Sequence, residues 1–464
     1  MATTTLKPTS LTIRAYQVGF GDCFLLTFEY AGATRKSDKE RHILIDFGST
    51  GMPKTVDSDG QMMKVARDIE ERCDGKLHMV VATHRHKDHI SGFATREDGS
   101  GTGEIIARLK PEIVVQPWTE NPKAKDPKKQ GKGKSKAPAA RGQQEHSLQP
   151  QYVSALSDMN VLSEAIQLEV SHLTSAKFMK GLNQELADQI RFLGDDNGLP
   201  NKSAVENLAK MGTNHYVNYG YELNVSRLLP GINLRFLGPP TLEQHAEIKC
   251  QRATDKSEFW MLQAAAQQFW SLQAATAELI GGFSSGNTRL FPNADVFQDF
   301  FPTHNRWFIR QLRALRGDQM LRLVRILDKA MNNTSVILLL EVGGKKLLFP
   351  GDAQIENWEY ALHLDKNANL KLLKDVYFYK VGHHGSRNAT PKTLWNNFAT
   401  RSADKKKRGR LHTMMSTMKG KHGHENSHTE VPRATLVNEL MNLSDYVTTE
   451  ESALSVDVKL TFQG

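Results

Sequence analysis

The segment Val80-Val-Ala-Thr-His-Arg-His-Lys-Asp-His-Ile-Ser-Gly92 decides how the rest of the chain is interpreted. An apolar, β-branched run ends abruptly in polar side chains, which predicts a strand that delivers them to the edge of a sheet. Imidazole nitrogens and carboxylate oxygens are the ligands that zinc, manganese or iron select. The cluster consists of His84, His86, Asp88 and His89. It predicts a metal site and a metal-dependent hydrolase; a histidine-rich surface loop is the alternative interpretation.

The chain has 464 residues, enough for two or three domains or for one large fold with insertions. No apolar run approaches the roughly 20 residues that span a bilayer. The start, Met-Ala-Thr-Thr-Thr-Leu-Lys-Pro, lacks the apolar core of a signal peptide. The three cysteines are widely spaced and indicate neither a disulfide framework nor a zinc knuckle. We therefore expect a cytoplasmic protein that has no membrane span.

Basic charge is concentrated in two segments. The net charge is +9, but residues 121–141 hold seven Lys, one Arg and one Asp, and residues 401–410 hold six Lys or Arg and one Asp. These segments carry +7 and +5, so the remainder of the chain is −3. Basic loops can bind polyanions through counterion release, or they can be solvated linkers.

Strands alternate with helices in the first quarter of the chain, which favours α/β layers with a largely buried sheet. Strands are predicted at 11–18, 22–30, 42–46, 78–83, 113–116, 220–228, 232–237, 335–342, 346–350, 376–382, 411–417 and 453–462. Helices are predicted at 60–72, 105–109 and 430–442. Residues 118–146 lack periodicity and predict a basic flexible loop. Residues 147–212 and 241–331 are predicted to be helical insertions.

Two further predicted strands end in residues of the ligand type. Lys346-Leu-Leu-Phe-Pro-Gly-Asp352 ends in a Gly-Asp turn, where glycine lets the backbone turn sharply. Tyr377-Phe-Tyr-Lys-Val-Gly-His-His-Gly-Ser386 places His383 and His384 after a strand. A carboxylate can bridge two cations, so the three strand ends together predict a two-metal centre.

The order H-x-H-x-D-H, Gly-Asp, His resembles the metallo-β-lactamase-fold hydrolase superfamily. Finer motifs are similar to its branch represented by the hydrolase domain of ComEC-type competence proteins. These motifs are Val18-Gly-Phe-Gly-Asp22, Ile43-Leu-Ile-Asp-Phe-Gly48, Asp88-His-Ile-Ser-Gly92, Asn333-Thr-Ser-Val-Ile337, Phe349-Pro-Gly-Asp-Ala353 and Gly382-His-His-Gly-Ser386. The resemblance covers 11–117, 220–240 and 332–440. It implies an αββα sandwich formed by residues 1–240 and 332–464, with metals in a cleft along one edge.

The resemblance also implies a set of ligands for two divalent ions, zinc or manganese. Binding of a single ion is the alternative that stays open. His84 and His86 would hold one metal, Asp88, His89 and His383 the other, and Asp352 would bridge them. His384 would support the site or face the substrate, and the reverse assignment of His383 and His384 stays open. Asp46 would be the carboxylate that orients a ligating histidine.

One departure concerns the first metal. The superfamily usually supplies another histidine between the first cluster and the Gly-Asp turn, and no histidine in 90–350 follows a convincing strand. His215 is the least unsuitable candidate, and an ordinary surface or core histidine is the alternative. The first metal would then bind weakly, keep more water, or use Asn333 or substrate oxygens.

A fourth group of histidines lies in Lys421-His-Gly-His-Glu-Asn-Ser-His-Thr-Glu430. In the similar branch a Gly-His-Pro-type turn occupies this place. His428 aligns best with it, and His424 is the alternative. Either imidazole would protonate a leaving oxygen or hold a phosphate, unless the segment is a solvated loop.

These expectations favour a phosphodiesterase or nuclease that acts on nucleic acid or nucleotides through a metal-activated water. The residues expected to take part in the reaction are Asp88, His384 and His428. A lactonase or other carbon–oxygen ester hydrolase is the alternative enzyme. An alternative of another class is a metal-bearing component of a multiprotein system, with residues 241–331 contacting a partner or a second copy.

Overall fold

A computed structural model describes residues 6–31, 39–53, 56–122, 152, 153, 156, 201–249, 331–364, 368–386, 390–421 and 430–462. The chain divides into two compact units. The first, which we call the sheet unit, comprises Met1–Lys123, Asn201–Ile248 and Met331–Gly464. The second comprises Ala124–Pro200 and Lys249–Ala330. Most of the expected basic loop 118–146 and most of both expected insertions lie outside the described residues, but Trp118–Glu120, at the start of that loop, forms a 3-10 helix.

The first of two mixed β-sheets carries the N-terminal half of the candidate site. The first three pairs of neighbouring strands, counted from one edge of the sheet, are antiparallel, and the remaining three pairs are parallel. The cluster His84–His89 follows the carboxyl end of a parallel strand. In spatial order the strands are β13 (Ser455–Thr461), β1 (Pro8–Tyr16), β2 (Cys23–Tyr30), β3 (Glu40–Phe47), β4 (Met79–Val81), β5 (Ile113–Pro117) and β6 (Thr213–Val217).

The second mixed sheet carries the C-terminal half. Its first four strands in spatial order are parallel, and the remaining pairs are antiparallel. They are β12 (Asp445–Thr448), β11 (His412–Met415), β10 (Val376–Lys380), β9 (Lys345–Phe349), β8 (Ile337–Val342) and β7 (Ile232–Gly238). Because β11 runs parallel to β10, the basic residues 401–410 that precede it lie at the opposite end of the sheet from His383.

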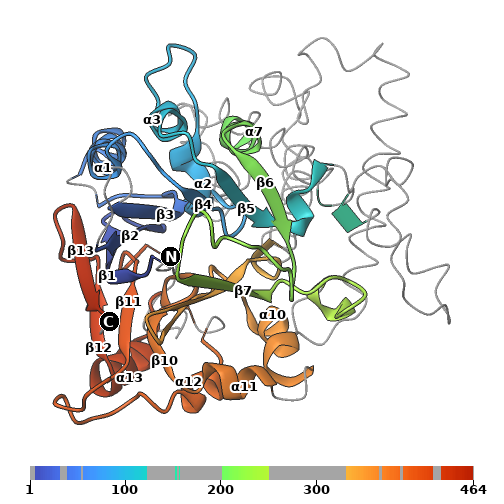
Figure 1. Ribbon diagram of the computed structural model, residues 1–464, viewed down its shortest axis with the longest axis vertical. Coiled ribbons are helices and arrows are strands. Elements are labelled where there is room, and N and C mark those ends of the chain that lie inside the picture. Colours follow the sequence, from blue (N-terminus) through green and yellow to red (C-terminus); the bar gives the residue numbers. More distant parts are fainter. Residues whose placement is uncertain are drawn as a thin grey trace, which may run out of the picture. The chain divides into compact units, whose positions relative to one another are not determined.

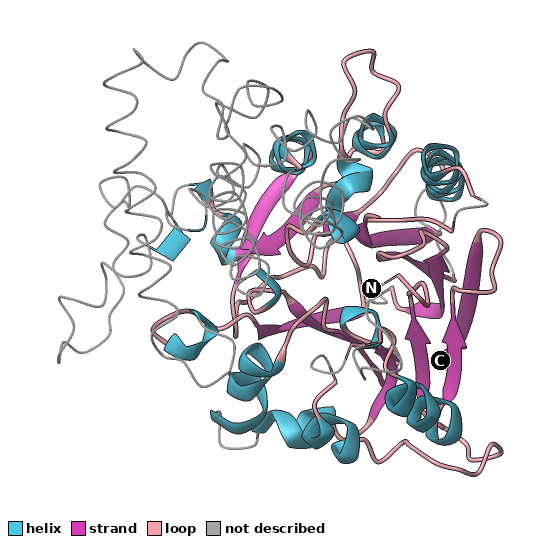
Figure 2. Cartoon of the chain, turned by 180° about the vertical axis from the view of Figure 1, so that it is seen from behind, coloured by secondary structure: helices cyan, strands magenta, loops and turns pink. Residues whose placement is uncertain are grey.

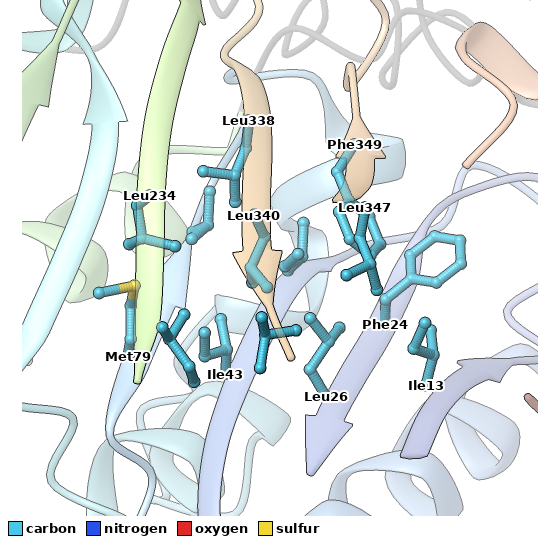
Figure 3. Packing of buried hydrophobic residues seen from close by; sticks show 14 of the residues in the cluster. Ile13, Phe24, Leu26, Ile43, Met79, Leu234, Leu338, Leu340, Leu347 and Phe349 are labelled. Atoms are coloured by element: carbon cyan, nitrogen blue, oxygen red, sulfur yellow. The ribbon is translucent and has the colours of Figure 1, made fainter. Parts of the chain in front are cut away.

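Apolar side chains of both sheets form one buried cluster between them (Figure 3). Successive residues of a strand point to opposite faces, so Ile43 joins this inner cluster while Leu44 joins a second cluster on the outer face. Leu338 and Leu339 of β8 are divided in the same way. Each fully buried aliphatic side chain contributes about 1.5–3 kcal/mol, and this burial holds the two sheets face to face.

Helices cover both outer faces. Figure 1 shows α1, α3 and α7 beside the first sheet and α11, α12 and α13 beside the second, and Figure 2 shows the same arrangement from behind. The described helices are α1 (Ser58–Cys73), α2 (Lys87–Ile90), α3 (Thr102–Arg108), α7 (Lys202–Lys210), α10 (Ile355–Glu359), α11 (Ala368–Leu373), α12 (Lys392–Asn397) and α13 (Ala434–Leu443). None of these helices has the length and apolar character needed to cross a bilayer. The expected mixed α/β class is confirmed.

The register of the first sheet explains which residues reach the candidate site. The strand β2 is antiparallel to β3, and Cys23 pairs with Phe47. The start of β2 therefore lies at the carboxyl end of β3, and Asp22 comes beside Asp46. The two sheets are joined at this end by a hydrogen bond from the backbone N–H of Val336 to the carbonyl of Thr83, at 2.8 Å.

Some local predictions were wrong. Residues 220–228 form no strand, although Leu223 and Val225 alternate. Their apolar side chains pack on the inner cluster, and the segment ends in a turn in which the N–H of Leu228 donates to the carbonyl of Val225. The strand β6 was not predicted, and α7 belongs to the sheet unit although it lies within the expected insertion 147–212. Helices at 355–359, 368–373 and 392–397 were also missed.

Candidate metal centre

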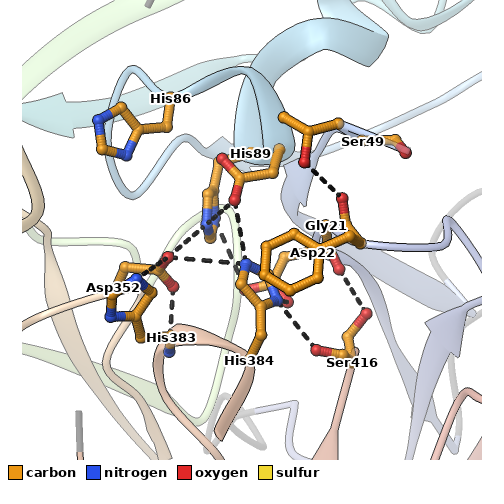
Figure 4. Close-up of polar contacts among 12 residues, drawn as sticks. Gly21, Asp22, Ser49, His86, His89, Asp352, His383, His384 and Ser416 are labelled. Atoms are coloured by element: carbon orange, nitrogen blue, oxygen red, sulfur yellow. Dashed lines mark hydrogen bonds and ion pairs between the residues drawn. The ribbon is translucent and has the colours of Figure 1, made fainter. Parts of the chain in front are cut away.

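Two aspartates and two histidines from both sheets converge at the strand ends (Figure 4). Asp88 and His89 lie in α2, directly after β4, whereas Asp352 and His384 follow β9 and β10. One ligand atom of each lies within 4.8 Å of the others. Nε2 of His89 is 3.1 Å from Oδ2 of Asp352, and Nε2 of His384 is 3.1 Å from Oδ2 of Asp88. We call these four residues the inner group; its size and donor atoms suit a divalent cation.

Asp46 fixes the orientation of His89. Its Oδ2 accepts a hydrogen bond from Nδ1 of His89 at 2.8 Å. The same carboxylate accepts the backbone N–H and the hydroxyl of Thr83, both at 2.7 Å. Because Nδ1 is occupied, Nε2 of His89 points into the inner group, which is the usual arrangement of a ligating histidine and its outer carboxylate.

His384 is oriented in the same way from the other sheet. Its Nδ1 donates to the backbone carbonyl of Ser416 at 3.0 Å, so Nε2 faces Asp88. The side chain is completely buried, and its ring centroid is 4.3 Å from that of Phe20. The backbone of His384 has φ 51°, a left-handed conformation that costs free energy in a residue other than glycine and that concentrates at functional sites.

A second group of possible metal ligands consists of His84, His86 and Asp88; we call it the outer group. Nε2 of His84 is 3.0 Å from Nδ1 of His86, and Nδ1 of His84 is 3.2 Å from the hydroxyl of Thr83. Burial, followed by the neighbouring imidazoles of His89 and His86, holds the pKa of His84 well below its ordinary value. His84 is therefore neutral and offers a lone pair to a cation.

The inner group has a different charge state. Burial alone would lower the pKa of His89, but the carboxylates of Asp352, Asp46 and Asp88 outweigh it and hold that pKa well above its ordinary value. Burial would raise the pKa of Asp352, but His89 and then His384 hold it well below the usual range. In the absence of metal the inner group therefore contains a charged imidazole between carboxylates, and a bound cation would displace its proton.

A buried ion pair lies behind the inner group. Lys380, the last residue of β10, pairs through Nζ with Oδ2 of Asp22, and both side chains are almost completely buried. The same Nζ is 3.8 Å from Oδ1 of Asp352. Burial alone would lower the pKa of Lys380, but Asp22 and then Asp352 raise it above its ordinary value. The ammonium is therefore charged.

Two glycines allow the loops at this end to pack tightly. A Cβ on Gly48 would lie 2.4 Å from the carbonyl oxygen of Lys87, and one on Gly21 would lie 2.2 Å from the carbonyl oxygen of Gly48. Both approaches are closer than any side chain permits. The motifs Gly19-Phe-Gly-Asp22 and Asp46-Phe-Gly48 thus bring their aspartates against the helix that carries Asp88 and His89.

The geometry differs from the expected ligand assignment in two respects. His384, rather than His383, belongs to the inner group, which is the reverse assignment that the sequence left open. Nε2 of His383 is 4.0 Å from Oδ2 of Asp352, and its Nδ1 is 2.8 Å from the hydroxyl of Ser386. The residue shared by the inner and outer groups is Asp88; the bridging role expected of Asp352 stays a prediction.

The other candidates have separate positions. Asn333 lies in the turn before β8, fully buried, with no hydrogen bond to either amide atom from the described residues. An unpaired buried amide calls for a ligand or a water, so its role beside the first metal stays a prediction. His215 lies in β6 with Nδ1 3.1 Å from the hydroxyl of Tyr221, and among the described residues it joins no ligand group. His424 and His428 lie outside the described residues.

Asp22, Lys380 and Ser416 were not predicted as site residues. Asp22 stands in a motif that the sequence singled out, and the antiparallel pairing of β2 with β3 would have placed it beside Asp46. The sequence around Lys380 is that of an ordinary strand, and it does not predict the contacts with the carboxylates of Asp22 and Asp352. Ser416 contributes a backbone carbonyl, which has no sequence signal.

Comparison with protein-family models finds no match for this chain, and a comparison with curated proteins finds no relative.

Proposed function

We propose that the protein is a metal-dependent hydrolase that cleaves phosphodiester bonds in nucleic acid or nucleotides. The observation that carries this proposal is the pair of ligand groups that share Asp88. Two cations held by adjacent groups can act on the attacking and leaving oxygens of one displacement reaction. A single isolated ligand group would support a structural metal equally well.

The motif order supports assignment to the metallo-β-lactamase-fold superfamily and its ComEC-like branch. Two face-to-face sheets with helices on both outer faces are what its αββα sandwich would require. The ligand residues also follow the expected strand ends. Fold resemblance is a weak warrant for a substrate. The choice of phosphodiesters therefore depends mainly on the ComEC-like motifs and on the basic segment 121–141, of which residues 123–141 lie outside the described residues.

The ligand sets follow from the two groups. His84, His86 and Asp88 would hold one zinc or manganese ion, and Asp88, His89, Asp352 and His384 would hold the other. When bound, such ions lower the pKa of a coordinated water and polarise the phosphoryl group. The chain itself orients the ligands. Asp46 holds Nδ1 of His89 and the carbonyl of Ser416 holds Nδ1 of His384, so that both Nε2 atoms face the inner group.

His383 is the histidine best placed to meet a substrate. Its side chain is 26% exposed, whereas the imidazole of His384 is fully buried. The Ser386 hydroxyl holds its Nδ1, which leaves Nε2 facing Asp352. We assign to Nε2 of His383 the task of holding a phosphoryl oxygen or delivering a proton to the leaving oxygen, a step that typically contributes 10²–10⁴-fold to the rate.

The proposal is tested with the full chain, stripped by chelator and reloaded with Mn²⁺ or Zn²⁺. Bis-p-nitrophenyl phosphate, single-stranded DNA and RNA are the phosphodiester substrates, and a γ-lactone tests the alternative enzyme class. The variant Asp88→Asn removes the shared ligand, and Asp98→Asn, an exposed aspartate in the same part of the chain, is the matched control. We expect metal-dependent phosphodiester cleavage by wild type and control that is lost in Asp88→Asn.

Equal inactivity of wild type and Asp88→Asn on every substrate would contradict an enzymatic role. Cleavage of the lactone alone would replace the phosphodiester by a carbon–oxygen ester as the substrate class.

A further inference from the structure

Lys380 is a buried cation at a site otherwise rich in buried carboxylates. Its ammonium pairs with Asp22, lies 3.8 Å from Oδ1 of Asp352 and is 3.4 Å from the carbonyl oxygen of Gly351. A charged group loses several kcal/mol of solvation when it is buried and is tolerated only with close partners. A neutral side chain of similar length would fill the same space at the end of β10 without that cost, so the charge itself calls for an explanation.

Asp22 holds the ammonium from the opposite sheet. It precedes β2, and its backbone is fixed on both sides: its N–H donates to the carbonyl of Asp88 at 2.8 Å, and its own carbonyl accepts the N–H of Gly48 at 3.0 Å. Asp22 is therefore a rigid anchor. Because Lys380 belongs to the second sheet, the ion pair crosses from one sheet to the other directly behind the inner group.

The two carboxylate oxygens of Asp352 have different surroundings. Oδ1 accepts the backbone N–H of His383 at 3.1 Å and faces Lys380. Oδ2 faces the imidazoles, with Nε2 of His89 at 3.1 Å and Nε2 of His384 at 3.7 Å. The protein thus engages one oxygen and leaves the other directed into the inner group.

We propose that Lys380 is a positioning residue of the metal centre: anchored by Asp22, its ammonium holds Oδ1 of Asp352, so that Asp352 binds a metal through Oδ2 alone. This inference rests on the proposed metal centre but not on the identity of the substrate. It limits the coordination number at the inner group, because Asp352 cannot chelate one ion with both oxygens while Oδ1 is engaged. A position is thereby left for water or substrate.

A simpler role has to be separated from this one, namely that Lys380 only neutralises Asp22. The single variant Lys380→Met leaves the buried carboxylate of Asp22 with only the imidazoles of His89 and His384, at 3.6 and 3.7 Å, which is destabilising. The double variant Asp22→Asn, Lys380→Met removes one negative and one positive charge, so the net charge of the cluster is unchanged. The carboxylate of Asp22 also lies 3.6 Å from Nδ1 of His89 and 3.7 Å from Nδ1 of His384. Only a loss of metal affinity beyond that of the single variant Asp22→Asn is therefore assigned to the lost contact with Asp352.

The experiment measures dissociation constants for Zn²⁺ and Mn²⁺ by chelator competition, together with thermal stability and the visible spectrum of the Co²⁺-substituted protein. We compare wild type, both single variants, the double variant and Lys380→Arg. We expect the double variant to fold with a melting temperature near that of wild type and to bind metal roughly 10-fold more weakly, as is typical when an outer contact of a ligand is lost.

We expect a spectroscopic change as well. Without the ammonium, Oδ1 keeps the backbone N–H of His383 but has a free lone pair. Asp352 can then bind through both oxygens, so the d–d absorption of Co²⁺ should weaken as its coordination number rises. Lys380→Arg keeps a cation and should recover part of the affinity. A double variant with wild-type affinity and spectrum would overturn the positioning role while leaving the proposed function intact. A wild-type chain that binds neither metal would overturn both.

Discussion

Nδ1 of His89 donates a hydrogen bond of 2.8 Å to Oδ2 of Asp46, although the two residues lie 43 positions apart in the chain. The contact exists because β3 and β4 are parallel neighbours whose carboxyl ends coincide. It determines which ring nitrogen of His89 faces the inner group. The same carboxylate holds Thr83, whose hydroxyl lies against His84, so Asp46 supports both ligand groups.

Replacing Asp46 should therefore weaken metal binding without removing a ligand. In Asp46→Asn the amide has one acceptor oxygen for three donors, so His89 and Thr83 compete for it. We expect a 10–100-fold loss of affinity for Zn²⁺ or Mn²⁺, measured by chelator competition. Asp59→Asn, at an exposed residue of α1, is the control. An affinity equal to that of wild type would show that Asp46 does not orient a ligand.

Substitution of His384 should affect metal binding, whereas substitution of His383 should affect the rate of turnover. We expect His384→Gln to lose bound metal, measured as ions per chain by elemental analysis after dialysis. His383→Gln should keep its metal and lose about 10²–10⁴-fold of the rate on bis-p-nitrophenyl phosphate. The reverse result, with metal lost from His383→Gln and retained in His384→Gln, would restore the assignment first expected from the sequence.

The tight packing at Gly48 gives a stability prediction. Gly48→Ala would place a Cβ 2.4 Å from a backbone oxygen, and such overpacking typically costs 1–3 kcal/mol or more. It should lower metal affinity too, because the displaced backbone carries Asp88 and His89. Gly75→Ala is the comparison: Gly75 has φ +79° and open space around it, so we expect about 1 kcal/mol from backbone strain and unchanged metal binding. Urea denaturation and chelator competition measure the two effects.

The pH dependence of metal binding has a definite sign. The pKa of His89 is held well above its ordinary value, about 6.5. Its ion pairs therefore stabilise the metal-free protein fully below pH 6.5 and less as pH rises through the raised pKa. A metal must displace this proton, so its affinity rises over the same range. We expect the metal-induced rise in melting temperature to grow from pH 6 to pH 8; a constant shift would indicate that His89 is not a ligand.

Much of this centre could be predicted because its residues stand at the ends of apolar strands. Asp88, His89 and Asp352 each follow an apolar run whose length and composition favour a buried strand, and a polar cluster in that position has few structural uses. His383 and His384 could not be told apart, since adjacent residues share the same local pattern. Both have a left-handed backbone, and what separates them is the partner of Nδ1: the carbonyl of Ser416 for His384 and the hydroxyl of Ser386 for His383.

The prediction was weakest where residues interact only across the two sheets. Lys380 and Asp22 are 358 positions apart, and the residues around each of them do not predict that the two side chains pair. Residues 220–228 illustrate the same difficulty for the fold. Alternation of apolar residues predicts that one side of a segment is buried. It does not predict whether a neighbouring strand with free backbone groups is present to pair with it.

The division of the ligands between the two sheets has a consequence for biosynthesis. Asp88 and His384 are 296 positions apart, and a nascent chain that has emerged only as far as β6 contains His84, His86, Asp88 and His89 but neither Asp352 nor His384. Such a chain can offer a cation the outer group, or the carboxylates of Asp22 and Asp46 beside His89, but not the complete inner group. Loading of the inner group must wait until β9 and β10 have been synthesised and have docked, which makes full metal acquisition a late event in the maturation of this protein.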